Sequence, residues 1–365
     1  GDEIGHGTHV ASIALGNGPF FRGIAPEADL AIVRSTLFDG LVPALVFLDD
    51  AARERGVPLV VNLSLGGHVG PHDGTSPEAA AVDAFGHLVV VAAGNEGGDA
   101  VHAGATLSPG AVIDVALDFG VISAGLPLDG VVDVWGAPDA TLAIALIAVK
   151  DGRVVWTSGA LGPGTPGRTV PIAIEPGAPP LGEVELDAEP EKNRANGRPH
   201  VGLSITSTLS PGVTFAVRMA GSGRFDAWID APADIPRVPR FASAPTLGLA
   251  SEILGNAELS LSDLAASRRA IAVSAMVSRT EVDGTQVNRG VIGELAAFSS
   301  HGPTLDPVRT GDKPELTAPG LSIVAAASRT GTEAPLYRVR AGTSMAVPHV
   351  AGAVAVLLGL APRAN

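Results

Sequence analysis

Three short motifs in this sequence carry side chains that together could perform nucleophilic acyl chemistry. Ser344 lies in residues 342–352, where small residues form a turn before an apolar run that predicts a buried helix. A serine at such a turn has an exposed hydroxyl and free backbone N–H groups beside it. His6 is a candidate general base, because a near-neutral imidazole can both take and return a proton. Asn95 follows an apolar strand and offers an amide that could bind developing negative charge.

Each motif also has an ordinary structural explanation. Ser344 could simply cap its helix, and Asn95 could be a turn residue in a glycine-rich sequence. His6 and His9 lie on one helix face and could suggest a metal pair, but the His-Glu-x-x-His pattern of a zinc helix is absent. We therefore expect His9 and His349 to be packing residues and predict no metal ligands among the motifs.

The three motifs, in the order His6, Asn95, Ser344, closely resemble those of subtilisin-like serine peptidases. Residues 298–303 and 313–320 are similar to further motifs of that family. The resemblance implies a serine endopeptidase that works through an acyl-enzyme, with Ser344 as nucleophile and His6 as general base and then acid. It also implies that Asn95 and the backbone N–H of Ser344 bind the oxyanion.

The same resemblance implies where a protein or peptide substrate would bind. One segment resembles the edge that pairs with an extended substrate through main-chain hydrogen bonds, and it comprises Ser64, Leu65 and Gly66. The floor of the primary specificity pocket would comprise Ala92, Ala93 and Gly94. Small residues at this floor predict a roomy pocket.

No cofactor is required for this chemistry, although structural calcium is common in the family. Loop carboxylates that could ligate calcium are Asp73, Asp306 and Asp312. No spaced run of Asp and Asn ligands accompanies them. Solvated loop carboxylates are therefore the favoured interpretation.

Predicted strands and predicted helices alternate along residues 1–100 and again along residues 243–365. Predicted strands at 59–65 and 88–93 alternate with predicted helices at 41–52 and 77–85, and a further short buried strand is predicted at 30–33. Continuous apolar strands between helices are typical of a parallel sheet covered on both faces. With the resemblance, the expected fold is a subtilisin-like, doubly wound α/β peptidase domain.

Residues 101–242 have a different pattern of apolar residues. Period-two apolar patterns separated by Gly, Pro and Asp turns predict an inserted antiparallel β-sandwich of jelly-roll type. Such an insert between the oxyanion asparagine and the serine resembles the clostridial spore-germination subgroup of the family. Residues 70–76 and 223–228 also resemble that subgroup. Trp135, Trp156 and Trp228 are expected in the core of the sandwich.

Composition excludes several classes of function. The chain is 46% hydrophobic and only 17% charged, which is typical of a compact protein. A net charge of −14 argues against a nucleic-acid partner, and the absence of cysteine excludes disulfides and thiolate metal sites. We expect no membrane span. No signal peptide is recognisable in these residues. The expectation of a secreted or cell-envelope location therefore rests only on the family resemblance.

One member of the expected catalytic triad has no candidate. In this family the aspartate lies well upstream of the histidine, whereas only five residues precede His6 and Asp2 is too close along the chain. We expect the aspartate on a segment or second chain outside these residues, which would also complete the sheet, and we expect the peptidase domain to lack its C-terminal end. Alternatives are a non-catalytic pseudopeptidase or binding module, an inactive fragment, and, more weakly, a carbohydrate-binding insert.

Overall fold

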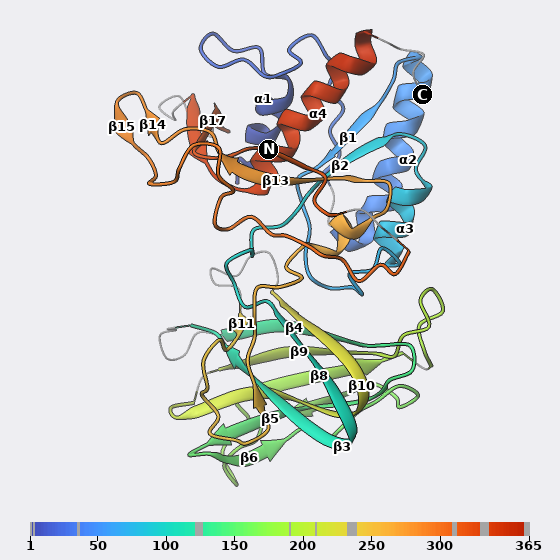
Figure 1. Cartoon of the computed structure of the whole chain (residues 1–365), viewed down its shortest axis with the longest axis vertical. Helices are drawn as coiled ribbons and strands as arrows, with labels where there is room; N and C mark the ends of the chain where they lie inside the picture. Colours follow the sequence, from blue (N-terminus) through green and yellow to red (C-terminus); the bar gives the residue numbers. More distant parts are fainter. Residues whose placement is uncertain are drawn as a thin grey trace. The chain divides into compact units, whose positions relative to one another are not determined.

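The structure is a computed structural model that describes residues 2, 4–34, 37–120, 127–189, 191–208, 210–231, 239–308, 312–328 and 336–360. The chain forms two compact units (Figure 1). Unit 1 consists of Gly1–Gly67, His72–Gly98 and Leu259–Asn365, and unit 2 consists of His68–Pro71 and Asp99–Glu258. The second unit extends past the sequence-based boundary at 242 because residues 252–253 pair with one of its long strands.

Unit 1 contains helices around a parallel sheet. In its first part the elements are α1 (His6–Leu15), α2 (Leu37–Arg55), β1 (Val60–Leu63), α3 (Pro77–Ala84) and β2 (Leu88–Ala92). In its second part they are η1 (Asp263–Ala266), β13 (Ile271–Val277), β14 (Glu281–Val282), β15 (Thr285–Gln286), β16 (Leu316–Leu321), β17 (Ile323–Ala326), β18 (Tyr337–Arg340) and α4 (Thr343–Leu360).

The parallel sheet has the strand order β1-β2-β13-β16. Alternation along β2 explains why both faces are covered: Val89 and Val91 pack with α2 and α3, whereas Val90 and Ala92 pack with α4. Figure 1 shows α1 and α4 on one side of β1 and β2, and α2 and α3 on the other side. The predicted mixed α/β fold with a parallel sheet is therefore confirmed.

Local sequence explains where the helices of unit 1 begin. Ser76 caps α3 by accepting a hydrogen bond from Ala79 N at 3.2 Å, and Pro77 occupies the first turn. The side chain of Asp2 accepts from Gly5 N at 2.8 Å and from Thr8 N at 2.7 Å, so it satisfies free donors at the start of α1. This helix carries the candidate base.

The predicted strand at 30–33 is wrong. These residues form no strand among the described part of the chain, and Leu30 and Ile32 are 51% and 67% exposed. The segment is apolar enough for a strand, but no described strand lies beside it to accept its hydrogen bonds. Apolar composition alone could not reveal the lack of a partner.

One described helix, α4, is long and apolar enough to cross a membrane by length and composition. In this structure its buried residues Ala346, Val347 and Ala351 pack in the core of the parallel sheet. The same features are typical of the core helix of a globular protein.

Unit 2 is antiparallel apart from one short parallel pair. Its strands are β3 (His102–Asp118), β4 (Pro127–Gly136), β5 (Thr141–Lys150), β6 (Arg153–Thr157), β7 (Arg168–Pro171), β8 (Gly182–Ala188), β9 (His200–Thr208), β10 (Val213–Asp230), β11 (Arg240–Phe241) and β12 (Glu252–Ile253).

The long strands β3 and β10 organise this unit. They pair along their lengths, with a register shift between Gly221 and Gly223. Beyond β10 the sheet branches, because β5 pairs with the first part of β10 and β4 with the last part. Ile144 and Leu146 of β5 share one buried core with Leu203 of β9, so the two branches cover the same interior. Jelly-roll topology for this unit stays a prediction.

Two of the three tryptophans are buried outside the main core cluster of unit 2. Trp135 and Trp228 are buried, and Trp156 packs against the main core from its edge. The expectation that all three tryptophans lie in the core of the sandwich is therefore wrong for Trp135 and Trp228. Both alternate along their strands with the core residues Val134 and Ala227, so they lie on the other face of the sheet.

Candidate active site

Ser344 is the second residue of α4, and its surroundings are set by glycine and proline. Gly342 has φ +149°, a conformation that residues with a Cβ rarely adopt, so the turn into the helix requires glycine. Pro348 has no N–H and leaves the Ser344 carbonyl without its usual partner in the helix. The Ser64 hydroxyl donates to that carbonyl at 2.8 Å, and the Ser344 hydroxyl donates to the Ser64 carbonyl at 3.3 Å.

Asn95 contacts the first residue of the same helix, α4. Its Oδ1 accepts from Thr343 N at 2.8 Å and from the Thr343 hydroxyl at 3.2 Å. Gly94 N donates to the Thr343 hydroxyl at 3.3 Å. Because these contacts use the oxygen of the amide, the Asn95 NH₂ group remains available for another acceptor.

The segments expected to hold substrate converge on Ser262. The Ser262 hydroxyl donates to the Ala92 carbonyl at 3.1 Å, and Ser262 N donates to the Ala93 carbonyl at 2.8 Å. A Cβ on Gly66 would lie 2.8 Å from the Ser262 hydroxyl oxygen, so this position needs glycine for close packing. The structure thus brings Gly66 close to the residues of the expected pocket floor, and Leu65 beside them is half-buried.

His6 occupies the first position of α1 and is half-buried. No described residue forms a hydrogen bond with its imidazole, and this includes Ser344. The helices that carry His6 and Ser344 pack against each other, because Val10 and Ile13 of α1 share a buried cluster with Met345 of α4. The structure therefore joins Ser344, Ser64 and Asn95 directly or through Thr343, and associates His6 with them through adjacent helices.

The electrostatic surroundings keep His6 neutral to lower pH than an ordinary imidazole. Burial lowers the pKa of His6, the Arg340 cation lowers it further, and the Asp2 carboxylate opposes them. A neutral imidazole is the form that accepts a proton from a nucleophile.

The other two histidines of the motifs have structural contacts. His9 is fully buried and its Nε2 contacts the Arg338 carbonyl at 3.1 Å. His349 Nδ1 contacts the Met345 carbonyl at 2.8 Å within α4. Neither belongs to a group of three or more potential metal ligands, and the described residues contain no such group.

Two of the candidate calcium ligands already have partners within the protein. Arg268 Nε and Nη2 donate to Asp306 at 2.6 and 3.0 Å, and the Asp73 carboxylate accepts from Thr75 N at 3.0 Å. These contacts favour structural roles for Asp73 and Asp306, whereas calcium binding itself stays untested.

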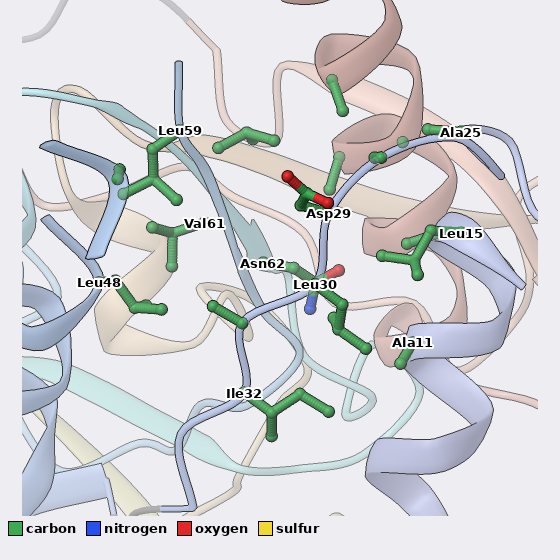
Figure 2. Close-up of a pocket in the computed structure, with 18 of the residues that line it drawn as sticks. Ala11, Leu15, Ala25, Asp29, Leu30, Ile32, Leu48, Leu59, Val61 and Asn62 are labelled. Carbon is green, nitrogen blue, oxygen red and sulfur yellow. The ribbon is translucent and has the colours of Figure 1, made fainter. Parts of the chain in front are cut away.

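A cavity of about 640 Å³ lies in unit 1 beside β1. Figure 2 shows Leu30 and Asn62 in the middle of the view, with Leu59 and Val61 to one side and Ala11 and Leu15 to the other. Its walls are mostly apolar and come from α1, α2, α4, residues 28–33 and β1. Because β1 is the last strand in the order of the described strands, the cavity borders a strand edge that no described strand pairs with.

Sequence reasoning missed three residues that support this site. Thr343 orients the Asn95 amide, Ser262 connects Gly66 to the pocket floor, and Arg340 lies near His6. Thr343 could have been suspected because it adjoins the serine. The contacts of Ser262 and Arg340 arise only in the folded chain, so no local pattern indicates them.

Comparisons with known proteins identify related sequences and a related fold. A family model described as "Subtilase family" matches residues 1–150 and 251–365. The minor extracellular protease Vpr of Bacillus subtilis is 26% identical over 375 residues, which cover 100% of this chain and 40% of that protein. Subtilisin-like protease SBT3.3 of Arabidopsis thaliana is 27% identical over 403 residues, covering 99% of this chain and 46% of that protein.

Among solved structures, the CspB protease of Clostridium perfringens has a similar fold. It matches with a TM-score of 0.70 and 24% sequence identity, covering 98% of this chain and 69% of that one. The chain spans less than half the length of the two curated relatives above.

Proposed function

Since the chain belongs to the subtilase family, we propose that the protein containing it is a serine endopeptidase that cleaves protein or peptide substrates. The observation that carries this proposal is the convergence of Ser344, Ser64 and Asn95 at the start of α4. A pseudopeptidase would need no oriented amide beside the serine.

In the proposed reaction His6 takes the proton of the Ser344 hydroxyl as its oxygen attacks the substrate carbonyl. His6 then returns the proton to the leaving amine, so an acyl-enzyme remains on Ser344 and water later removes it. The half-buried position of His6 and its lowered pKa suit it for the first proton transfer.

The negative charge of the tetrahedral intermediate would be bound by the Asn95 NH₂ group and the Ser344 N–H. Support comes from the Thr343 contacts, which occupy the amide oxygen and leave the donor side free to turn to substrate. The segment Ser64–Gly66 would pair with the main chain of the substrate, and Ala92, Ala93 and Gly94 would line its side-chain pocket.

The triad carboxylate would arrive on an extended segment that lies outside these 365 residues and fills the cavity beside β1. Support comes from the edge of β1 that no described strand pairs with, the exposed Leu30 and Ile32 in the lining, and the apolar character of that lining. A strand there would pair with β1 and bury that lining. Its carboxylate would fix the tautomer of His6 and stabilise the imidazolium.

A fluorophosphonate probe tests the proposed nucleophile. The intact protein should be labelled, and Ser344→Ala should abolish the labelling. Ser204→Ala is the matched control, because Ser204 is exposed on β9 and its hydroxyl forms no hydrogen bond among the described residues. Failure of the intact, folded protein to react, or equal labelling of Ser344→Ala, would exclude this function.

A single cysteine tests the occupant of the cavity, because the chain has no cysteine of its own. Ile32→Cys should react rapidly with a maleimide in the 365-residue chain and at least about tenfold more slowly in the intact protein, since burial restricts access to a thiol. Ser204→Cys should react equally in both. Equal reactivity of Ile32→Cys in the two proteins would contradict the proposed strand.

We further propose that the protein is exported from the cytoplasm, acts without a cofactor and does not bind nucleic acid. The Bacillus subtilis relative Vpr is named as an extracellular protease. The net charge of −14 disfavours association with a phosphate backbone. Fractionation of the native cells tests the first point: activity confined to the cytoplasm would refute export.

A further inference from the structure

The segment His68–Pro71, called the strap below, belongs to unit 2 although its flanking residues belong to unit 1. It follows Ser64–Gly66, the proposed substrate edge, with only Gly67 between them. His68, Gly70 and Pro71 are buried. Buried backbone groups need hydrogen-bond partners, and those of the strap are supplied by charged side chains.

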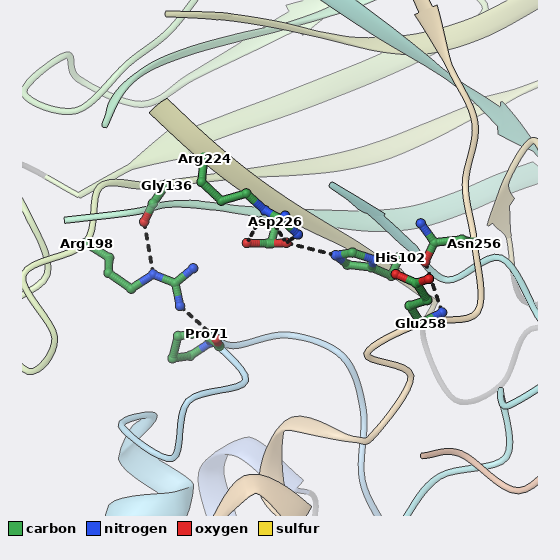
Figure 3. A network of polar contacts seen from close by, with 8 residues as sticks. All are labelled: Pro71, His102, Gly136, Arg198, Arg224, Asp226, Asn256 and Glu258. Atoms are coloured by element: carbon green, nitrogen blue, oxygen red, sulfur yellow. Dashed lines mark hydrogen bonds and ion pairs between the residues drawn. The ribbon is translucent and has the colours of Figure 1, made fainter. Parts of the chain in front are cut away.

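Three such contacts hold the strap. His68 N donates to Asp230 Oδ2 at 2.6 Å, and Gly70 N donates to Asp133 Oδ2 at 2.7 Å. At the other end, Arg198 Nη1 donates to the Pro71 carbonyl at 3.1 Å, as Figure 3 shows. Charge-assisted hydrogen bonds of this kind are stronger than those between neutral groups.

Asp133 is the central anchor. It is 4% exposed, and its Oδ2 also accepts from Trp135 Nε1 at 2.7 Å. Its Oδ1 pairs with His200 Nε2, and the His200 ring stacks on Trp135 with centroids 4.2 Å apart. Both oxygens are therefore committed, so the carboxylate has one orientation in which to receive Gly70 N.

The strap has little freedom to adopt another conformation while these contacts last. Gly70 has φ +139°, a region that favours glycine. Arg198 is fixed in turn, because its Nε donates to the Gly136 carbonyl at 2.9 Å and its guanidinium lies 5.9 Å from the Trp135 ring centroid. All three anchors thus depend on strands of unit 2.

Of the residues between β1 and the strap, Ser64 is held by two hydrogen bonds with Ser344, and the three residues that follow have fewer restraints. Leu65 is half-buried, Gly66 is exposed, and Gly67 is held through its carbonyl by Asp263 N at 2.9 Å. A substrate edge that is already extended loses less conformational entropy when a peptide pairs with it. Anchoring the chain immediately after the edge would help to keep the edge extended before a peptide binds.

We propose that Asp133, through its hydrogen bond to Gly70, is a positioning residue that holds the substrate edge Ser64–Gly66 ready for an extended peptide. This inference rests on the proposed function, because it assigns that edge to substrate. It gives the inserted unit a specific part in substrate binding without placing any of its side chains on the substrate.

Amide hydrogen exchange of the intact protein tests the anchor without requiring activity. Asp133→Ala should increase exchange at least about tenfold in both the strap and residues 64–67, because removing one charge-assisted contact releases the buried N–H of Gly70. Asp133→Asn keeps the shape but not the charge and should give a smaller increase. Asp129→Ala, on the same strand, is the control, since the Asp129 carboxylate forms no hydrogen bond among the described residues.

Steady-state cleavage of denatured casein provides the second readout. Asp133→Ala and Asp133→Asn should raise KM, the former by about tenfold, with kcat within about twofold and an unchanged rate of Ser344 labelling by a small fluorophosphonate. A purely structural loss would lower labelling in parallel. Absence of all labelling in the unmodified protein would refute the peptidase function, while the exchange data would still decide the anchor.

Two results would overturn the proposal. One is unchanged exchange at residues 64–67 in both folded Asp133 variants. The other is increased exchange in the strap accompanied by an unchanged KM.

Discussion

The side-chain oxygen of Asn95 accepts a hydrogen bond of 2.8 Å from the backbone N–H of Thr343, one residue before the proposed nucleophile. This contact, with the 3.2 Å contact from the Thr343 hydroxyl, determines which end of the amide is free. The donor end is the one that an oxyanion requires. Thr343 therefore connects two motifs that lie 248 residues apart.

Replacement of Asn95 should affect turnover far more than substrate binding. Asn95→Ala removes the proposed donor, and we expect kcat to fall by about 100- to 1000-fold, the loss measured for the corresponding donor in subtilisin itself. Thr343→Ser, which keeps both contacts, is the control and should change kcat by less than about threefold. A similar kcat for Asn95→Ala and the unmodified protein would remove Asn95 from the mechanism.

The acid limb of the pH–rate profile should follow the two charges near His6. Arg340 lowers the pKa of His6 and Asp2 raises it, although burial has the largest effect. Because the base must be neutral, Arg340→Gln should move the acid limb of kcat/KM to higher pH and Asp2→Asn should move it to lower pH. Shifts in the same direction would show that the limb belongs to another group.

The stability of unit 2 should depend on pH through His200. Burial disfavours its charged form, but Asp133 outweighs burial, Glu189 and Asp187 add to the effect, and the pKa of His200 is raised above its ordinary value of 6.5. The resulting stability is complete below about pH 6.5 and is lost as pH rises through the folded-state pKa.

Tryptophan fluorescence can follow this transition selectively, since all three tryptophans lie in unit 2. The urea midpoint should fall with rising pH in this range, and His200→Gln should remove much of that slope. An identical slope in His200→Gln would assign the pH dependence to other groups.

Two glycines of α4 should respond oppositely to alanine. A Cβ on Gly352 would lie 2.7 Å from Ile24 Cβ and 2.9 Å from the Ala14 carbonyl, whereas nothing lies within 4 Å of one on Gly359. Gly352→Ala should destabilise unit 1 by about 1–3 kcal/mol through overpacking. Gly359→Ala should stabilise it by up to about 1 kcal/mol. Calorimetry of both variants measures the two signs, and a stabilising Gly352→Ala would contradict the close contact between α4 and α1.

Much of the parallel sheet could be predicted because its signals are local. The continuous apolar run 88–92 is visible in the sequence, and in a strand its alternate residues face the two covered sides of the sheet. The turn before Ser344 is likewise visible as a glycine and small residues. The resemblance of the motifs to the subtilisin-like family then indicated the fold into which these strands and helices assemble.

The rest depends on contacts between residues far apart in the chain. The bond from His68 N to Asp230 spans 162 positions, so nothing near residue 68 indicates that the strap belongs to unit 2. Leu30 and Ile32 have the composition of a buried strand, and only the structure reveals that no described strand lies beside them. Local patterns specify what a segment can form but not which partner it meets.

Mapping of a trapped acyl-enzyme tests the central claim most directly. The intact protein would be mixed with an activated peptide ester, quenched in acid during the first turnover, digested and analysed by tandem mass spectrometry. We predict one acyl group per protein, attached to the Ser344 hydroxyl and absent from Ser344→Ala. Acylation of a different residue, or hydrolysis that persists in Ser344→Ala, would contradict the assignment of Ser344 as the nucleophile.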